Sequence, residues 1–256
     1  MLELAIAARL RAAGCVYAED EARLLMAAGR DPDELAAMVE RRIAGAPLEY
    51  VLGWAEFCGQ RIALDAGVFI PRRRTEFLVQ RAIEKVRPGD VVMDLCCGSG
   101  AVGAAVAASR DRVDLHAADV DPVAVRCARR NLARWGGTVY EGDLFAPLPE
   151  TLQGRVDLLV VNAPYVPSPA LATLPREARL HEPRLSLDGG PDGHRVQRRV
   201  AAQASRWLAP GGHLLMETSE HQAAQLADIV GRHGLPARIL RSDDWDATVI
   251  VGVQPA

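Results

Sequence analysis

Strand-like and helix-like segments alternate along most of this chain, and this alternation limits the possible fold more than any other feature. Short apolar runs predict strands at 91–95, 113–119, 138–144, 156–162, 213–217, 237–241 and 248–253. Helical spacing predicts helices at 77–86, 102–109, 122–135, 196–208 and 220–233. The pattern indicates an α/β fold with parallel strands and right-handed crossovers. No helix separates the last two strands, so we expect them to form an antiparallel hairpin at one end of the sheet.

The part before this alternating region has a different character. Apolar residues recur at helical spacing, and Asp31-Pro32-Asp33 is a typical helix start, which predicts a small helical domain over residues 1–46. Two strand-like runs, Tyr50–Leu52 and Arg61–Leu64, are separated by glycines and predict a β-hairpin. We therefore expect a helical domain at 1–46, a hairpin linker at 47–72 and the main domain at 73–256.

Composition narrows the classes of function. The net charge of −3 gives no broad basic surface, so nucleic acid is an unlikely class of partner on this ground. The first residues include Glu3 and no long apolar run, and no segment reaches membrane-spanning length, so we expect no signal peptide and no membrane partner. The five cysteines show no metal-binding spacing, which favours reduced thiols in a cytoplasmic protein without a metal site.

A glycine-containing loop follows the first strand of the main domain. Asp94 to Gly100 reads DLCCGSG, and glycines there would let the backbone approach a ligand at a helix N-terminus. Asp119 ends the second strand about twenty residues later, where an acid can bind both hydroxyls of a ribose. These two features fit either a dinucleotide or S-adenosylmethionine.

Asp94 favours S-adenosylmethionine. An acid just before the loop can meet the cationic amino acid part of that molecule, whereas it would repel a pyrophosphate. We expect Asp143 and Leu144, at the end of the third strand, to lie beside the adenine. The candidate cofactor-binding residues are Asp94, Cys96, Cys97, Gly98, Ser99, Gly100, Asp119, Asp143, Leu144 and Asn162.

A carboxamide ends the fourth strand, which is apolar enough to be buried on both faces. Asn162 is followed by Ala163, Pro164 and Tyr165, and the prolines at 164 and 167 prevent further strand pairing. The segment offers an amide, two backbone carbonyls and an aromatic ring at the carboxyl end of a central strand. This set suits a planar NH2 group, with acceptors for its two hydrogens and a ring for its flat face.

Five segments, in the same order along the chain, resemble those of the protein-(glutamine-N5) methyltransferases that modify peptide release factors. The family pattern N-P-P-Y corresponds to NAPY at 162–165, and I-P-R-P-x-T-E corresponds to IPRRRTE at 70–76. D-L-G-x-G-S-G corresponds to DLCCGSG at 94–100, and D-I-x-P to DVDP at 119–122. E-P-R-x-x-L-D-G-G-x-D-G corresponds to EPRLSLDGGPDG at 182–193. The resemblance implies a class I methyltransferase (Rossmann-like) fold: a seven-stranded mixed sheet with a small helical N-terminal domain and a β-hairpin linker.

The resemblance also implies an activity. The protein would transfer a methyl group from S-adenosyl-L-methionine, leaving S-adenosyl-L-homocysteine, to the side-chain amide nitrogen (N5) of a glutamine in an exposed loop of a protein. A release factor is the first candidate. Its catalytic residues would be Asn162, Ala163, Pro164 and Tyr165. Asn162 and the Ala163 carbonyl would accept the two amide hydrogens, and Tyr165 would pack on the amide plane. Residues 182–193 would form a wall of the substrate pocket.

The chain departs from the family pattern at three places. Ala163 replaces the first proline of the tetrad, which softens the loop but keeps the carbonyl. Cys96 replaces the first glycine of the cofactor loop, and its side chain costs energy there if the backbone needs a positive φ. Arg73 and Arg74 replace a proline and a residue that is usually acidic, and would add positive charge near the substrate entrance. Thr75, next to them, has the position of a helix cap.

Other classes of function remain open at this point. An adenine-N6 methyltransferase would also act on a planar NH2, although the net charge and the lack of a target-recognition domain disfavour it. A protein that binds S-adenosylmethionine without turnover is compatible with the Cys96 and Ala163 departures. A dinucleotide-dependent dehydrogenase is disfavoured by Asp94, and no nucleophile elbow supports a hydrolase.

Overall fold

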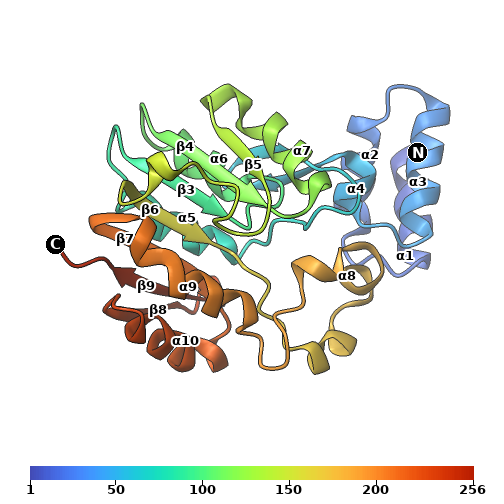
Figure 1. Ribbon diagram of the computed structural model, residues 1–256. Helices are drawn as coiled ribbons and strands as arrows, with labels where there is room; N and C mark the ends of the chain where they lie inside the picture. Colours follow the sequence, from blue (N-terminus) through green and yellow to red (C-terminus); the bar gives the residue numbers. More distant parts are fainter.

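The computed structural model describes residues 1–256 and consists of a group of N-terminal helices beside an α/β domain (Figure 1). The central sheet has seven strands in the order β5-β4-β3-β6-β7-β9-β8. The strands are β3 Val91–Leu95, β4 Asp114–Asp119, β5 Thr138–Glu141, β6 Val156–Val161, β7 Leu208–Thr218, β8 Ala237–Ser242 and β9 Ala247–Val253. The neighbouring pairs from β5 to β7 are parallel, and β9 is antiparallel to both β7 and β8. The mixed sheet and its terminal hairpin confirm the prediction.

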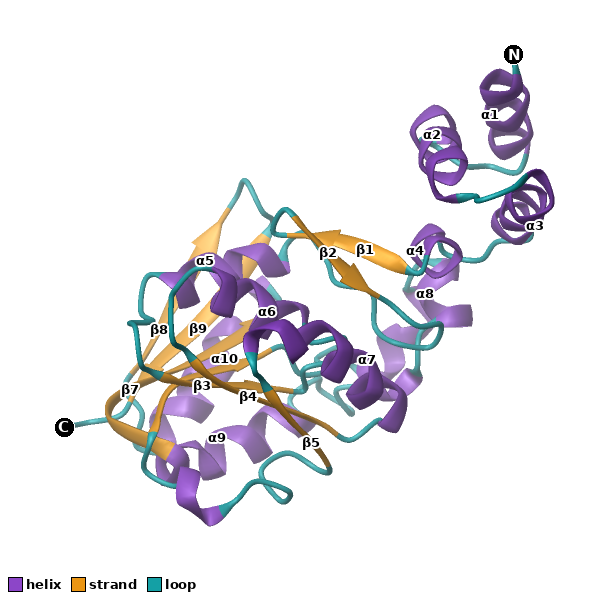
Figure 2. Cartoon of the chain, turned by 90° about the horizontal axis from the view of Figure 1, so that it is seen from above, coloured by secondary structure: helices purple, strands orange, loops and turns teal.

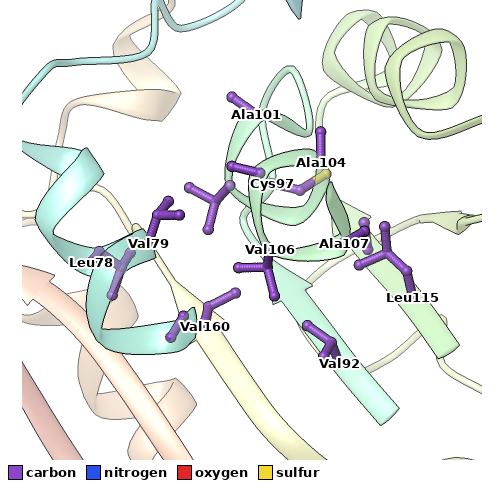
Figure 3. Close-up of a cluster of buried hydrophobic side chains, with 14 of the residues drawn as sticks. Leu78, Val79, Val92, Cys97, Ala101, Ala104, Val106, Ala107, Leu115 and Val160 are labelled. Atoms are coloured by element: carbon purple, nitrogen blue, oxygen red, sulfur yellow. The ribbon is translucent and has the colours of Figure 1, made fainter. Parts of the chain in front are cut away.

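Helices cover both faces of this sheet. They are α5 Thr75–Ile83, α6 Ala101–Ala108, α7 Pro122–Leu132, α9 Arg195–Trp207 and α10 Glu220–Arg232. Residues of β6 alternate between the two resulting cores, with Leu158 and Val160 facing α5–α7 and Leu159 and Val161 facing α9 and α10. Figure 3 shows the first core, where Val160 and Val92 lie among side chains of α5 and α6. The central strands are therefore buried on both faces, as their apolar sequences predict.

The order of the strands creates a crevice at the carboxyl ends of β3 and β6. The chain runs from β3 through β4 to β5 at one edge, then returns to place β6 on the other side of β3. Loops leaving β3 and β6 must diverge there, which is the usual ligand site of open α/β sheets. The register pairs Leu95 with Ala118 and Val161, and Val161 with Met216. The residues just beyond these four strand positions therefore meet at one edge.

The N-terminal helices have a core of their own. They are α1 Leu2–Ala12, α2 Ala18–Ala28, α3 Pro32–Ile43 and the short α4 Leu48–Leu52. Asp31 caps α3 by accepting the backbone N–H of Glu34 at 2.8 Å, which confirms the predicted helix start. Figures 1 and 2 show α1–α3 set apart from the sheet, with α4 and α8 (Arg176–His181) next to them.

A largely buried ion pair ties these helices together and to α8. Arg42 of α3 meets Glu21 of α2 with an Nε–Oε2 distance of 2.7 Å. The same guanidinium contacts Glu177 of α8 at 2.7 Å. The proposed division of the chain at residues 46 and 72 assigns α4 to the linker, although Val51 of α4 packs into the helical core.

The hairpin differs in detail from the prediction. Its strands are β1 Trp54–Phe57 and β2 Gln60–Ala63, whereas Tyr50–Leu52 forms the end of α4 and is not a strand. Pro47 precedes this single helical turn, and Gly53 ends it with a φ of 78°. Cys58 and Gly59 both have positive φ, which forms the two-residue turn that fixes the pairing of Phe57 with Gln60.

Asn131 fastens this hairpin to the main domain. Its Oδ1 accepts the Ala63 N–H at 2.9 Å, and its Nδ2 donates to the Ala63 carbonyl at 2.9 Å. The same Nδ2 donates to the Ser99 carbonyl at 2.8 Å. One side chain of α7 therefore holds both β2 and the loop after β3.

The remaining short segments lie in loops, two of them before β6 and two between β6 and α9. They are the 3-10 turns η1 Ala133–Trp135, η2 Glu150–Leu152, η3 Ser168–Thr173 and η4 Arg184–Ser186. The predicted strand at 138–144 stops at Glu141, because Gly142 has a φ of 156° and the turn after it takes Leu144 to a φ of 51°. None of the helices combines the length and the apolar character needed to cross a lipid bilayer.

Candidate active site

A single large cavity of about 860 Å³ lies at the carboxyl ends of β3, β4 and β6. It contains all four predicted catalytic residues, Asn162 to Tyr165. It also contains the predicted cofactor-binding residues Asp94, Cys96, Cys97, Gly98, Ser99, Asp119, Asp143 and Leu144. Gly100 is the exception, since it does not line the cavity. Segments predicted from separate motifs thus meet at one site.

Asp94 lies at the floor of what we call the cofactor end of the cavity, the part around residues 94–99 and 119. It is 2% exposed, and its Oδ2 accepts the Gly103 N–H at 2.8 Å. A Cβ at Gly103 would lie 3.1 Å from that oxygen, so the glycine allows the close approach of α6. Burial raises the pKa of the Asp94 carboxyl to about 7, partly offset by the Gly103 hydrogen bond.

Asp119 holds the loop from the neighbouring strand. Its Oδ2 accepts the Gly98 N–H at 2.8 Å, and its Oδ1 accepts the Asp121 N–H at 2.9 Å. Burial raises the pKa of this carboxyl as well. The interactions that offset burial at Asp94 and Asp119 are backbone N–H groups, and neither acid forms an ion pair with an arginine. The cofactor end therefore holds a buried acid, Asp94, and a half-buried one, Asp119, that lack a basic partner.

The loop between these acids depends on left-handed backbone. Cys96, Gly98 and Gly100 have φ values of 60°, 55° and 77°. Cys96 is thus a non-glycine residue in the left-handed region, the position at which a side chain is costly. Gly100 precedes α6, and a Cβ there would lie 3.1–3.3 Å from Leu132 and Ala128. Gly100 faces α7 and allows α6 and α7 to pack, and its contact with a ligand stays a prediction.

Asp143 and Leu144 line the cavity, although they lie beyond the end of β5. Leu144 is buried, whereas Asp143 is exposed and forms an ion pair with Arg199 of α9, with an Oδ2–Nη2 distance of 2.6 Å. Arg199 also lines the cavity. Sequence reasoning missed it, because the arginines of α9 give no signal of which one faces the site.

Asn162 and Tyr165 face what we call the acceptor end of the cavity, the part around residues 162–166 and 182–188. Asn162 Nδ2 donates to Thr75 Oγ1 at 3.3 Å, and the Tyr165 hydroxyl donates to Glu217 Oε1 at 3.2 Å. Thr75 is the first residue of α5 and makes no capping hydrogen bond. The expectation that it caps the helix is therefore wrong, because its hydroxyl is engaged by the site.

The segment 182–188 forms a wall of the acceptor end, as predicted. Val166 donates its N–H to the Leu187 carbonyl at 3.0 Å, and the Val166 carbonyl accepts the Gly189 N–H at 2.8 Å. This bridge joins the wall to the segment that carries Asn162. A Cβ at Gly189 would lie 2.5 Å from the Gly193 carbonyl oxygen, so the turn after the wall requires glycine. Residues 189–193 support the wall and do not line the cavity.

The side chains of the three consecutive arginines before α5 contact different partners. Arg72 pairs with the buried Glu182, and Arg74 Nε lies 3.6 Å from Glu217 Oε1. Both arginines line the cavity. Arg73 instead lies over the Trp245 ring at 5.5 Å and does not line the cavity. The expected positive charge at the entrance is therefore contributed by Arg72 and Arg74, each beside a glutamate, and not by Arg73.

The chemistry of the side chains and backbone at the cofactor end fits S-adenosylmethionine. Two acids without basic partners suit a ligand that carries positive charge, and they disfavour a pyrophosphate. Carboxylates accept hydrogen bonds, as ribose hydroxyls and an ammonium group require. The glycine loop gives backbone access next to the N-terminus of α6. We propose that Asp94 and residues 96–99 hold the amino acid part, that Asp119 holds the ribose, and that Asp143 and Leu144 hold the adenine.

Comparison with known proteins identifies the relatives of this chain. Residues 61–174 match the family described as "Methyltransferase small domain". The chain is 38% identical over 209 residues to the release factor glutamine methyltransferase of Geobacter sulfurreducens, covering 80% of this chain and 72% of that protein. It is 37% identical over 235 residues to the Mycolicibacterium smegmatis protein of the same name, covering 86% and 83%. It is also 36% identical to the 4-amino-L-phenylalanine/4-methylamino-L-phenylalanine methyltransferase of Streptomyces pristinaespiralis, covering 78% and 70%.

The fold agrees with these relatives. A methyltransferase from Pyrococcus furiosus superposes with a TM-score of 0.58 at 15% identity, covering 86% of this chain and 98% of that one. This likeness supports a class I methyltransferase fold. On the strength of the fold, the cavity and the relatives that span most of its length, the chain belongs to the release factor glutamine methyltransferase family and is an S-adenosylmethionine-dependent methyltransferase.

Proposed function

We propose that the protein methylates the side-chain amide nitrogen of a glutamine in another protein, with a peptide chain release factor as the first candidate. The observation that carries this proposal is the contact of Asn162 with Thr75. Because Nδ2 donates to Thr75, Oδ1 is left as the acceptor for a ligand at the junction of the two ends of the cavity. An uncharged NH2 group is the ligand that such an acceptor suits.

The chemistry requires alignment more than a strong base. An amide nitrogen is a poor nucleophile, because its lone pair is delocalised into the carbonyl. S-adenosylmethionine, when bound, supplies a methyl group activated by the adjacent sulfonium. Asn162 Oδ1 and the Ala163 carbonyl would accept the two hydrogens of the glutamine amide and orient its nitrogen. The same two oxygens would stabilise the positive charge that develops on that nitrogen.

Tyr165 completes the acceptor end. Burial raises the pKa of its phenol, and the neighbouring Glu217 carboxylate raises it further, so Tyr165 stays protonated and uncharged. Its hydroxyl is committed to Glu217, which leaves the ring to pack on the plane of the amide. Pro164 restricts the backbone between Asn162 and Tyr165. Together these residues would hold a neutral amide in a fixed orientation. None of them is a base that would deprotonate a hydroxyl or a carbon acid.

The partner would present its glutamine on an exposed loop. The target amide must reach Asn162 inside the cavity, which a side chain on a protruding loop can do. The N-terminal helices and the hairpin offer a second surface for a folded protein. The net charge of −3 argues against free nucleic acid as the partner. Since release factors act in translation, the proposal also implies a cytoplasmic protein.

Separate reactions test this function. The purified protein is incubated with methyl-labelled S-adenosylmethionine and, in turn, a release factor, the same factor with its labelled glutamine changed to glutamate, 4-amino-L-phenylalanine, and an adenine-containing oligonucleotide. We expect label on the first protein only, located on one glutamine by peptide mass mapping. Label on the oligonucleotide or on the arylamine, and on no protein, would replace the proposal with an adenine or an arylamine methyltransferase.

A further inference from the structure

The connection between β6 and α9 contains a long loop that is closed at its base. Val166 donates its N–H to the Leu187 carbonyl at 3.0 Å, and Ser168 Oγ donates to Asp188 Oδ1 at 2.6 Å. Residues 169–186, which we call the lid, leave this base, form α8 and return to it. A closed base allows such a loop to move as one piece about its two ends.

The lid has little apolar contact with the rest of the protein. Its buried residues are Ala178 and Glu182, and Ala178 belongs to none of the hydrophobic cores. Leu180 and Leu185 are 61% and 55% exposed. The backbone hydrogen bonds of the lid stay within it or reach its base. Few buried apolar contacts are typical of a segment that opens at a low cost in free energy.

Two ion pairs join the lid to a distant part of the chain. Arg42 Nη1 lies 2.7 Å from Glu177 Oε1, and Arg72 pairs with Glu182. Arg42 is fixed among the N-terminal helices, because its Nε also lies 2.7 Å from Glu21 Oε2. Glu177, Glu182 and Arg72 line the cavity. The two pairs therefore bridge two walls of the cavity, and Figure 2 shows α8 of the lid beside α4.

The cavity is small for the loop of a folded protein. Its volume of about 860 Å³ is that of a small-molecule site, and the cofactor would take part of it. We propose that the lid is displaced when the acceptor protein binds, and that the Arg42–Glu177 ion pair is the latch that holds it shut beforehand. The acceptor part of this inference rests on the proposed function. Since a latch that breaks on binding opposes binding, weakening it should favour the acceptor.

Amide hydrogen exchange tests the latch without any acceptor. A helix as short as α8 is unstable alone, so its hydrogen bonds persist only while the lid is shut. The N–H groups of Arg179 and Glu182, each in a 3.1 Å hydrogen bond inside the lid, should therefore be protected in the wild type. We expect exchange about threefold faster in Glu177→Gln, which removes the charge. It should be about tenfold faster or more in Glu177→Lys, which opposes Arg42 with a like charge.

A substitution on the other side of the latch leaves the sequence of the lid unchanged. Arg42→Lys keeps a positive charge for Glu21, but an ammonium group cannot contact Glu21 and Glu177 together as the guanidinium does. Exchange in α8 should again rise about threefold. Glu40→Gln is the matched control on α3. It removes the exposed ion pair with Arg9, which does not involve the lid, and should leave exchange in α8 unchanged.

Steady-state kinetics tests the displacement. In Glu177→Gln the KM for the acceptor protein should fall about threefold, with kcat within about twofold of wild type. The Kd for S-adenosylmethionine should not change, because the lid does not form the cofactor end. A KM that stays the same or rises would overturn the displacement.

The exchange experiment can fail separately. The latch is refuted if α8 in the wild type exchanges as fast as a free peptide, or if neither Glu177→Lys nor Arg42→Lys speeds its exchange. If the exchange results hold but no glutamine is methylated, the latch stands and the proposed function fails.

Discussion

The two ends of the cavity differ in how the negative charge of their acids is compensated. At the cofactor end, Asp94 and Asp119 are satisfied by backbone N–H groups and have no basic partner. At the acceptor end, the buried Glu182 and Glu217 each have an arginine, Arg72 and Arg74, nearby. The first end therefore retains negative charge for a ligand to neutralise, whereas the second is balanced by the protein itself.

This difference matches the two ligands. A buried acid without a counter-charge binds a cation strongly and destabilises the protein when the ligand is absent. S-adenosylmethionine carries positive charge, and a glutamine amide carries none. An acceptor end that is already neutralised avoids a preference for charged side chains, and it selects through hydrogen-bond geometry instead. The comparison predicts that charge gives the cofactor end its affinity for S-adenosylmethionine, while hydrogen-bond orientation positions the amide at the acceptor end.

Asn162→Ala is the strongest test of the acceptor end. The variant loses the oxygen that orients the amide and stabilises developing charge, so kcat should fall on the order of a thousandfold. The Kd for S-adenosylmethionine should stay within about tenfold, because charge at the other end is untouched. Steady-state kinetics with calorimetry measures both values. Full activity in this variant would remove Asn162 from the mechanism.

Asp119→Ala tests the opposite end. Two charge-assisted hydrogen bonds to the ribose, each worth about 1.5 kcal/mol or more, would be lost, and the Kd should rise on the order of a hundredfold. The Gly98 N–H also loses its partner. At saturating S-adenosylmethionine kcat should recover much of its wild-type value. An unchanged Kd would mean that Asp119 does not bind the ribose.

Asp94→Asn tests whether the charge of Asp94 contributes to the affinity for S-adenosylmethionine. With a pKa of about 7, Asp94 becomes protonated as the pH falls through neutrality, so wild-type affinity for S-adenosylmethionine should decrease below that pH. The variant should bind about tenfold more weakly at pH 8, with a flatter pH profile. Calorimetry between pH 6 and 8 measures this. A steep profile in the variant would assign the dependence to Asp119, whose pKa burial also raises.

The same substitution predicts a change in stability. A carboxyl whose pKa is raised in the folded state contributes stability below its unfolded pKa and loses it as the pH rises through the folded value. Asp94 should thus weaken the cofactor-free protein between about pH 4 and pH 7. Asp94→Asn keeps an acceptor for Gly103 and should raise the free energy of unfolding at pH 8, measured by urea denaturation without ligand. A loss of stability there would contradict the account of an uncompensated acid.

Cys96→Gly should have the smallest effect. A non-glycine residue at a φ of 60° costs about 1–2 kcal/mol, and the greater freedom of glycine in the unfolded chain offsets about half of this. We expect the free energy of unfolding to rise by about 1 kcal/mol or less, with a Kd for S-adenosylmethionine within about twofold. Thermal denaturation and calorimetry measure these changes. A large loss of affinity would show that the sulfur, and not the backbone, serves the ligand.

The strands and the cofactor end were accessible from sequence because their signals are local. The central strands are apolar runs, and the boundaries of β3, β4 and β6 were predicted to within about one residue. In contrast, β7 begins at Leu208 and not at residue 213, and β5 ends at Glu141 and not at residue 144. Tyr50–Leu52 was misread, since an aromatic residue followed by a β-branched one resembles a strand. Pro47 and Gly53 bound it as one turn of helix, and only the packing of Tyr50 and Val51 shows which reading holds.

The contacts of Thr75 and Glu217 behind the acceptor end could not be predicted from local sequence patterns. Thr75 contacts Asn162, and Glu217 contacts Tyr165, although both partners are distant in sequence. These contacts depend on the register of β6 with β7 and on where α5 begins. A threonine before a helix resembles a cap, and a glutamate at the end of an apolar strand resembles a surface residue. The packing of Gly100 against α7 was not predicted for a related reason, because a glycine motif does not reveal which glycine faces a neighbouring helix.

The side chain of Asn131 couples the attachment of the hairpin to the order of the loop after β3. If the hairpin detaches from α7, the Ala63 N–H and carbonyl lose their partner, and the same side chain can no longer hold the Ser99 carbonyl. Detachment of β2 and disorder of the loop after β3 should therefore occur as one cooperative opening, and not as independent fluctuations. A partner protein that displaced the hairpin would consequently also disturb the loop after β3, which lines the cofactor end of the cavity.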